Sequence, residues 1–142
     1  MNTPTTPAAS SRRQFIGTTA AASALTVAQS AWAAGSDKVK IGLIGSGGRG
    51  SGAADQALTT PNANFVLHAV CDAFKEKAES SLSNLRNKHA ERVQVDDRIY
   101  DGVEGYKKVI DSCDLVILTT PPGFRPQHLK AAIAAGKHVF CE

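Results

Sequence analysis

A glycine-rich turn between a short apolar run and a helical segment constrains the fold of this chain more than any other feature. Residues 39–44 read VKIGLI and GSGGRG follows at once, so Gly45, Gly47 and Gly50 fill the pattern GxGxxG. The first glycine permits a sharp turn off a strand, the second leaves bare backbone for an anion, and the third lets a helix lie close to the sheet. The amides and dipole of the helix N-terminus then face that anion. The pattern predicts the strand, turn and helix of a dinucleotide-binding βαβ unit.

An acidic residue after the next apolar run supports the same interpretation. The apolar run 65–71 is followed by Asp72, which lies 22 residues beyond Gly50. A carboxylate at this place accepts hydrogen bonds from both hydroxyl groups of an adenosine ribose and repels a 2′-phosphate, so the sequence favours NAD as cofactor. NADP stays possible, because Arg49 or Lys75 could supply a cation to a phosphate. Asp72 could instead form a turn or cap the helix that begins near Lys75.

The first 33 residues resemble a targeting segment. Residues 11–17, SRRQFIG, form a twin-arginine pattern, and an uncharged run closes with the small-x-small sequence Ala31-Trp32-Ala33. The run is too weakly apolar to prefer a bilayer, so we expect no stable insertion in a membrane. We expect residues 1–33 to be a signal peptide that directs export through the twin-arginine route, to the periplasm. A disordered basic tail is the alternative.

Charge and cysteine content exclude several classes of function. Arg12 and Arg13 supply two of the three net positive charges, so the rest of the chain is nearly neutral and shows no nucleic-acid surface. We expect Cys71, Cys113 and Cys141 to be small buried hydrophobes, since no spacing suggests a metal site. Cys71 and Cys141 fall on strands that are three spacings apart, about 14 Å, which is too far for a disulfide.

Strands and helices alternate along residues 34–142. The expected strands are 39–44, 65–71, a short one within 93–100, 115–119 and 138–141. The expected helices are 49–58, then 75–88 with Ala78, Leu82 and Leu85 on its inward face, then a short helix that carries Val103, Tyr106 and Ile110. The last expected helix has Pro126 in its first turn and Gly136 as its cap. Its buried stripe is expected to be Leu129, Ala132 and Ile133. This alternation predicts an α/β fold: a Rossmann-type doubly wound parallel sheet in the order 3-2-1-4-5, with helices on both faces. We expect 34–142 to be one NAD(P)-binding domain, truncated after strand five, with a second domain absent from this chain.

In such a sheet the cofactor lies across the carboxyl ends of the strands, near the switch point between the first and fourth. The expected cofactor-binding residues are Gly45, Ser46, Gly47, Gly48, Arg49, Gly50, Asp72, Thr119, Thr120, Pro121 and Glu142. His128 follows the fourth strand and could belong to the site or to the surface. We expect His89 at the surface, His68 in packing or solvent, and His138 to be a structural residue of its strand. The sequence shows no catalytic residue and no metal-ligand set.

Four segments together, VKIGLIGSGGRG, VCDAFKEKAE, DLVILTTPPGFRPQHL and AAIAAGKHVFCE, resemble the glucose-fructose oxidoreductase and inositol dehydrogenase family, Gfo/Idh/MocA. The resemblance implies a two-domain nicotinamide-dependent oxidoreductase of sugars or polyols. Thr120 and Pro121 match the family's Thr-Pro, and Glu142 matches the glutamate of its Glu-Lys-Pro segment. Arg125 stands where many members have a histidine. The family's proton-relaying lysine would follow Glu142, so we expect the chain as given to be inactive alone.

Export and cofactor binding support each other, because an exported enzyme must hold tightly a cofactor that only the cytoplasm supplies. This suggests a bound cofactor recycled between two substrates, as the resemblance implies. We expect the full-length protein to be a homo-oligomer. The alternatives are a non-catalytic nucleotide-binding module, an inactive fragment, or a Rossmann domain with another adenosine ligand.

Overall fold

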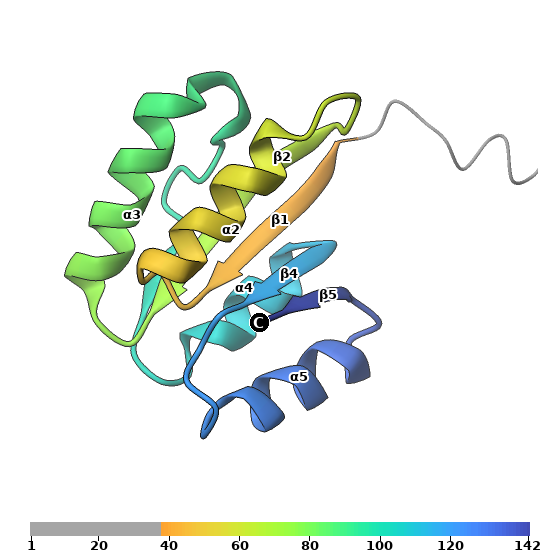
Figure 1. Cartoon of the computed structure of the whole chain (residues 1–142). Helices are drawn as coiled ribbons and strands as arrows, with labels where there is room; N and C mark the ends of the chain where they lie inside the picture. Colours follow the sequence, from red (N-terminus) through yellow and green to blue (C-terminus); the bar gives the residue numbers. More distant parts are fainter. Residues whose placement is uncertain (1–37) are drawn as a thin grey trace, which may run out of the picture. The chain divides into compact units, whose positions relative to one another are not determined.

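Strands and helices alternate through residues 38–142, the part of the chain that the computed structural model describes (Figure 1). The predicted signal peptide lies outside the described residues. The strands are β1 (Val39–Ile44), β2 (Phe65–Asp72), β3 (Ile99–Asp101), β4 (Leu115–Leu118) and β5 (His138–Cys141). The helices are α2 (Gly48–Thr59), α3 (Lys75–Lys88), α4 (Gly105–Ser112) and α5 (Arg125–Ala134), with a short 3₁₀ turn, η1, at Ala90–Arg92.

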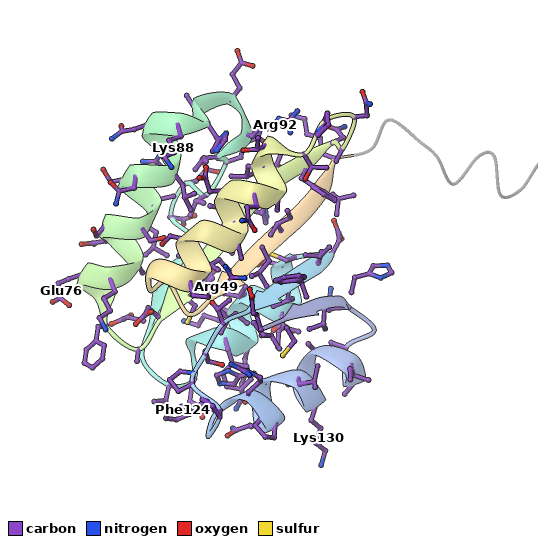
Figure 2. The ribbon with its side chains drawn as sticks, viewed as in Figure 1. Arg49, Glu76, Lys88, Arg92, Phe124 and Lys130 are labelled. Atoms are coloured by element: carbon purple, nitrogen blue, oxygen red, sulfur yellow. The ribbon has the colours of Figure 1, made fainter. Side chains whose placement is uncertain are left out.

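All neighbouring strands of the sheet are parallel, in the order β3-β2-β1-β4-β5. One core packs α2 and α3 against the first face of this sheet, and a second core packs α4 and α5 against the other. The charged side of α3 is exposed, as the position of Glu76 shows in Figure 2. The predicted Rossmann-type fold, its strand order and the bounds of α3 are therefore confirmed.

Val103, which we expected within a short helix, and Ile133, which we expected in a buried stripe, are both exposed. Val103 is 59% exposed because the chain turns at Gly102, with φ of 76°, and α4 begins only at Gly105. Ile133 is 64% exposed, since the inward positions of α5 are His128 and Ala132, one turn apart. The Gly136 cap is confirmed: its φ is 67°, and its N–H donates to the carbonyl of Ile133 at 2.9 Å.

The edges of the sheet differ most from the expectation. The third strand begins at Ile99, while Val93 makes only an isolated bridge with Leu67. Cys141 is exposed because β5 is the edge strand, so the prediction of three buried cysteines was wrong for this one. Cys71 and Cys113 are buried, and all three thiols are free.

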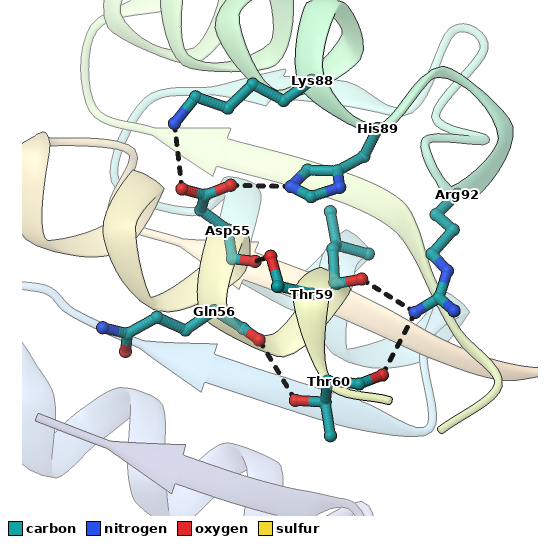
Figure 3. A network of polar contacts seen from close by, with 8 residues as sticks. Asp55, Gln56, Thr59, Thr60, Lys88, His89 and Arg92 are labelled. Atoms are coloured by element: carbon teal, nitrogen blue, oxygen red, sulfur yellow. Dashed lines mark hydrogen bonds and ion pairs between the residues drawn. The ribbon is translucent and has the colours of Figure 1, made fainter. Parts of the chain in front are cut away.

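A polar network joins the C-terminal ends of α2 and α3 (Figure 3). The Asp55 carboxylate contacts Lys88 Nζ at 2.9 Å and His89 Nε2 at 2.6 Å, and these two hydrogen bonds lower the pKa of Asp55. Arg92 donates to the carbonyl of Leu58 at 2.7 Å. The His89 side chain is only 16% exposed, so its prediction as a surface residue was wrong. The network fastens the end of α2 that lies away from the glycine turn.

Candidate functional site

The three motif glycines differ in the space around them. Gly45 has φ of 94°, and a Cβ atom there would lie 2.9 Å from the carbonyl carbon of Thr119. A Cβ on Gly50 would lie 1.9 Å from the Gly45 oxygen. A Cβ on Gly47 would meet nothing within 4 Å. Gly45 therefore serves the turn, Gly50 serves the close approach of α2, and Gly47 leaves open space above the backbone.

Two side-chain hydrogen bonds connect the glycine turn to the ends of the neighbouring strands. Thr119 Oγ1 donates to the Gly45 carbonyl at 2.6 Å, and the buried Ser46 Oγ donates to the Cys71 carbonyl at 3.2 Å. The turn at the end of β1 is thus joined to the segments after β4 and at the end of β2. These contacts also hold the open side of the turn, at Gly47, in place.

The Asp72 carboxylate is oriented by two backbone amides. Oδ2 accepts the N–H of Ser46 at 2.7 Å, and Oδ1 accepts the N–H of Phe74 at 3.1 Å. The second bond makes Asp72 a turn residue, but Asp72 does not cap α3, whose N-cap is Phe74. A carboxylate has about four lone-pair directions, so acceptor capacity is left for two further donors.

A crevice of about 440 Å³ opens at the carboxyl ends of the strands. Six of the eleven expected residues line it: Gly45, Gly47, Asp72, Thr119, Thr120 and Pro121. The other five lie beside it and not in its wall: Ser46, Gly48, Arg49, Gly50 and Glu142. Arg49, labelled at the first turn of α2 in Figure 2, forms an ion pair with Glu142. This pair connects the glycine turn with the residue that follows β5.

Apolar residues form the rest of the crevice wall, and the sequence analysis missed most of them. Three of the five large apolar side chains that are exposed in residues 38–142 line this crevice, namely Phe74, Val103 and Phe124. The buried Tyr106 also lines the crevice. Their shared position on loops after β2, β3 and β4 was the available indication, because those loops meet at one edge of a parallel sheet.

His128 belongs to the crevice wall, which decides between the two positions considered for it. It is 5% exposed, and its Nδ1 lies 3.2 Å from Thr120 Oγ1. Its ring centroid is 4.2 Å from that of Tyr106 and 6.2 Å from that of Phe124. Burial lowers the pKa of His128, so the ring is neutral at pH 7. Arg125, at the position where the resemblance led us to expect histidine, donates to the Thr120 carbonyl at 2.9 Å.

The cysteine that lines the crevice is protonated, and residues 38–142 form no metal centre. Burial raises the pKa of the Cys71 thiol to about 12, which keeps it protonated. No cluster of three or more His, Cys, Asp or Glu residues within this part of the chain could hold a metal ion. In the same residues, no helix combines the length and the apolar character needed to cross a membrane. The crevice offers backbone, carboxylate and apolar groups that can bind and orient a ligand.

Comparisons with known proteins connect this chain with an NAD-binding fold. Residues 39–142 match the family model GFO_IDH_MocA, described as an oxidoreductase family with an NAD-binding Rossmann fold. A glycosyl hydrolase family 109 protein from Streptomyces coelicolor is 31% identical over 107 residues, which make up 73% of this chain and 21% of that protein. The chain thus spans about a fifth of the length of the curated relatives it matches.

Solved structures share the fold. Myo-inositol dehydrogenase from Lactobacillus casei, in complex with NAD(H) and myo-inositol, has a TM-score of 0.58 and 22% identity, covering 74% of this chain and 28% of that one. An NAD-binding protein from Listeria innocua has a TM-score of 0.56 and 28% identity, covering 74% and 26% of the two chains.

Proposed function

Because the chain belongs to the Gfo/Idh/MocA oxidoreductase family and carries its NAD-binding Rossmann domain, we propose that it supplies the cofactor site of a dehydrogenase acting on a sugar or polyol. The observation that carries this proposal is the crevice, in which an open glycine turn, an oriented carboxylate and an apolar wall meet at one sheet edge. These are the groups that a pyrophosphate, a ribose and a flat heterocycle require.

Each part of the crevice would hold a different part of the dinucleotide. The backbone at Gly47 and the N-terminus of α2 would bind the pyrophosphate, since nothing occupies the space above Gly47. The Asp72 carboxylate would accept hydrogen bonds from the hydroxyl groups of the adenosine ribose. Because it would repel a 2′-phosphate, it favours NAD over NADP. Thr119, Thr120 and Pro121 would line the course of the cofactor toward the β4 side. When bound, the nicotinamide ring supplies the hydride chemistry, and the residues of this chain bind and orient it.

The assignment of the glycine turn is tested by filling the open space. Gly47 has φ of −68° and ψ of −176°, which valine adopts without strain, so Gly47→Val leaves the fold intact. The added side chain occupies the proposed pyrophosphate site, and we expect calorimetric NAD binding to fall at least tenfold. Gly52→Val is the matched control, because Gly52 lies in α2, the helix that Gly47 caps, and a Cβ there also meets open space. This variant should bind NAD like the parent. Equal NAD affinity in Gly47→Val and the parent would show that the turn has another role.

We infer the substrate class from two enzymes that share the fold. An inositol dehydrogenase and a UDP-N-acetylglucosamine 3-dehydrogenase share the fold, and both are named for oxidising a hydroxylated ring. This supports a polyol or sugar substrate. The test is to load the product of the complete gene with NAD, to add inositols and aldoses, and to follow the absorbance of reduced cofactor. Cofactor binding without any turnover would favour a nucleotide-binding module.

Cleavage of a glycosidic bond is a second candidate reaction. The curated relatives named as glycosyl hydrolases are 31% and 32% identical to this chain, a higher identity than that of the inositol dehydrogenases. Net oxidation accumulates reduced cofactor, whereas hydrolysis leaves the redox state of the cofactor unchanged overall. Release of a free sugar from a glycoside without accumulation of NADH would therefore favour the hydrolase.

We also propose that the protein is exported with its cofactor already bound. The twin-arginine pattern around Arg12 and Arg13 supports this proposal, because that route carries folded proteins. A cofactor carried in this way must be retained through many turnovers, which favours recycling between two substrates. We propose in addition that the full-length enzyme is a homo-oligomer.

A further inference from the structure

Two hydroxyl groups in the wall of the crevice already have protein partners. Thr119 Oγ1 donates to the Gly45 carbonyl at 2.6 Å, and the Tyr106 hydroxyl accepts a hydrogen bond from Gln127 Nε2 at 3.1 Å. In a mostly apolar wall, the few polar atoms that stay available to a ligand decide how that ligand is oriented. Any such atom on the β4 side of the crevice therefore bears on specificity.

One ring nitrogen of His128 is such an atom. Nδ1 lies 3.2 Å from Thr120 Oγ1, and within residues 38–142 no protein group bonds to Nε2. In this part of the chain, the fully buried side-chain nitrogen that lacks a partner is Nε of Arg125, so Nε2 of His128 is accessible. Because His128 is only 5% exposed and lines the crevice, Nε2 is accessible from the crevice.

Several contacts fix the position of the His128 ring. The N–H of His128 donates to the Phe124 carbonyl at 3.2 Å, and the ring centroid lies 4.2 Å from that of Tyr106. Its partner Thr120 is held in turn, since the Thr120 carbonyl accepts a hydrogen bond from Arg125 at 2.9 Å. Many family members have a histidine at the position of Arg125, one helical turn earlier, so the family pattern does not account for His128.

The base of the adenosine is the part of the cofactor that would contact this wall. Asp72 would hold the adenosine ribose, and the base attached to that ribose would lie in the same crevice, against Phe74, Val103 and Phe124. Adenine carries one exocyclic amino group, which donates hydrogen bonds. An amino group placed against an apolar wall without an acceptor costs free energy. Nε2 of His128 can supply that acceptor.

We propose that His128 selects the base of the dinucleotide: Nδ1–H donates to Thr120 Oγ1, and Nε2 accepts a hydrogen bond from the exocyclic amino group of adenine. This inference rests on the proposed cofactor site and adds a specificity-determining residue to it. Burial lowers the pKa of His128, which keeps the ring neutral and Nε2 able to accept at pH 7. Hypoxanthine has an oxygen in place of the amino group, so two acceptors would face each other.

The experiment is a calorimetric titration at pH 7.5 of NAD and of nicotinamide hypoxanthine dinucleotide, in which this oxygen replaces the amino group. The parent chain should bind NAD about fivefold more tightly than the analogue, which corresponds to about 1 kcal/mol for one hydrogen bond. His128→Leu removes the acceptor and should bind both dinucleotides equally. Thr120→Val should also reduce the preference, because Nδ1–H loses its acceptor and the hydrogen can move to Nε2.

His68→Leu is the matched control. It makes the same change at a histidine of β2 that does not line the crevice, so it should keep the parent's preference for NAD. Long-range ¹⁵N NMR of the parent chain loaded with NAD gives a second measurement, and it should place the ring hydrogen of His128 on Nδ1.

Three results would overturn the inference. They are equal affinity of the parent for the two dinucleotides, a preference for NAD that persists in His128→Leu, and a ring hydrogen on Nε2 in the NAD-bound chain. Loss of the preference in His68→Leu would show a general effect of histidine removal and would contradict the inference as well. Failure of the parent chain to bind either dinucleotide would refute the cofactor site itself, which is a separate outcome.

Discussion

Adding a single methyl group to Gly50 should separate the packing role of this glycine from the other effects of a substitution in α2. Gly50 and Gly52 lie two residues apart in the same helix. An alanine in place of a helical glycine stabilises a protein by about 1 kcal/mol when its methyl group has space. A Cβ on Gly52 meets nothing within 4 Å, so Gly52→Ala should be stabilised by about that amount.

An alanine in place of Gly50 would collide with the glycine turn. Its Cβ would lie 1.9 Å from the Gly45 oxygen and 2.5 Å from Thr119 Oγ1, so α2 and the turn must move apart. Such overpacking costs about 1–3 kcal/mol. The hydrogen bond from Thr119 to Gly45 joins the same two groups, and its loss costs about 1 kcal/mol. After the gain in helix propensity, Gly50→Ala should be destabilised by about 1–3 kcal/mol relative to the parent.

The difference in stability between Gly50→Ala and Gly52→Ala can be measured by thermal and urea unfolding of both variants and the parent. For a domain of about 100 residues, 1 kcal/mol shifts Tm by about 4–8 °C, so Gly50→Ala should melt at least about 8 °C below Gly52→Ala. NAD binding should also weaken in Gly50→Ala, because the turn is displaced. If the two variants melt within 2 °C of each other, the close approach at Gly50 does not control the packing of α2.

Two further predictions concern His128 and the N-terminal segment. Burial holds the pKa of His128 in the folded state below 6.5, its ordinary value. The unfolded chain therefore takes up a proton at this residue before the folded chain does. The contribution of His128 to the free energy of unfolding is complete above pH 6.5 and is lost as the pH decreases toward the lowered pKa. His128→Gln should therefore lose less stability than the parent in urea unfolding between pH 7.5 and pH 5.5, and an unchanged pH dependence would contradict this account. Export should depend on Arg12 and Arg13, so changing both to Lys should leave the precursor in the cytoplasm. Periplasmic accumulation of that variant at the parent level, measured by cell fractionation, would indicate another route.

The fold was predictable from the sequence because its signals are local. The apolar runs of β1, β2, β4 and β5 and the stripe of α3 each contain enough residues to fix their type and approximate bounds. Exposure at single positions was less predictable, because it depends on which elements lie opposite. Ile133 follows the spacing of a buried residue, yet the buried residues of α5 are His128 and Ala132, on the adjacent face of the helix. His89 shows the reverse: we expected it at the surface, but it is partly buried and contacts Asp55 of the neighbouring helix α2.

The polar part of the candidate site was also accessible from the sequence, whereas its apolar wall was not. The glycine turn and Asp72 belong to a spacing with a known physical reason. Phe74, Val103 and Phe124 lie on three different connections, and no spacing relates them in the chain. Only the parallel sheet brings these connections to one edge.

The amides that hold the Asp72 carboxylate belong to the protein itself, and this has a kinetic consequence. Ser46 and Phe74 fix the carboxylate during folding, and Thr119 fixes the neighbouring turn in the same way. The loss of freedom is therefore incurred when the chain folds and not when a ligand arrives. Association with a dinucleotide needs no slow rearrangement of this edge, so its rate constant should lie in the range set by diffusion and orientation. Differences in affinity among variants of the crevice should then arise in the dissociation rate.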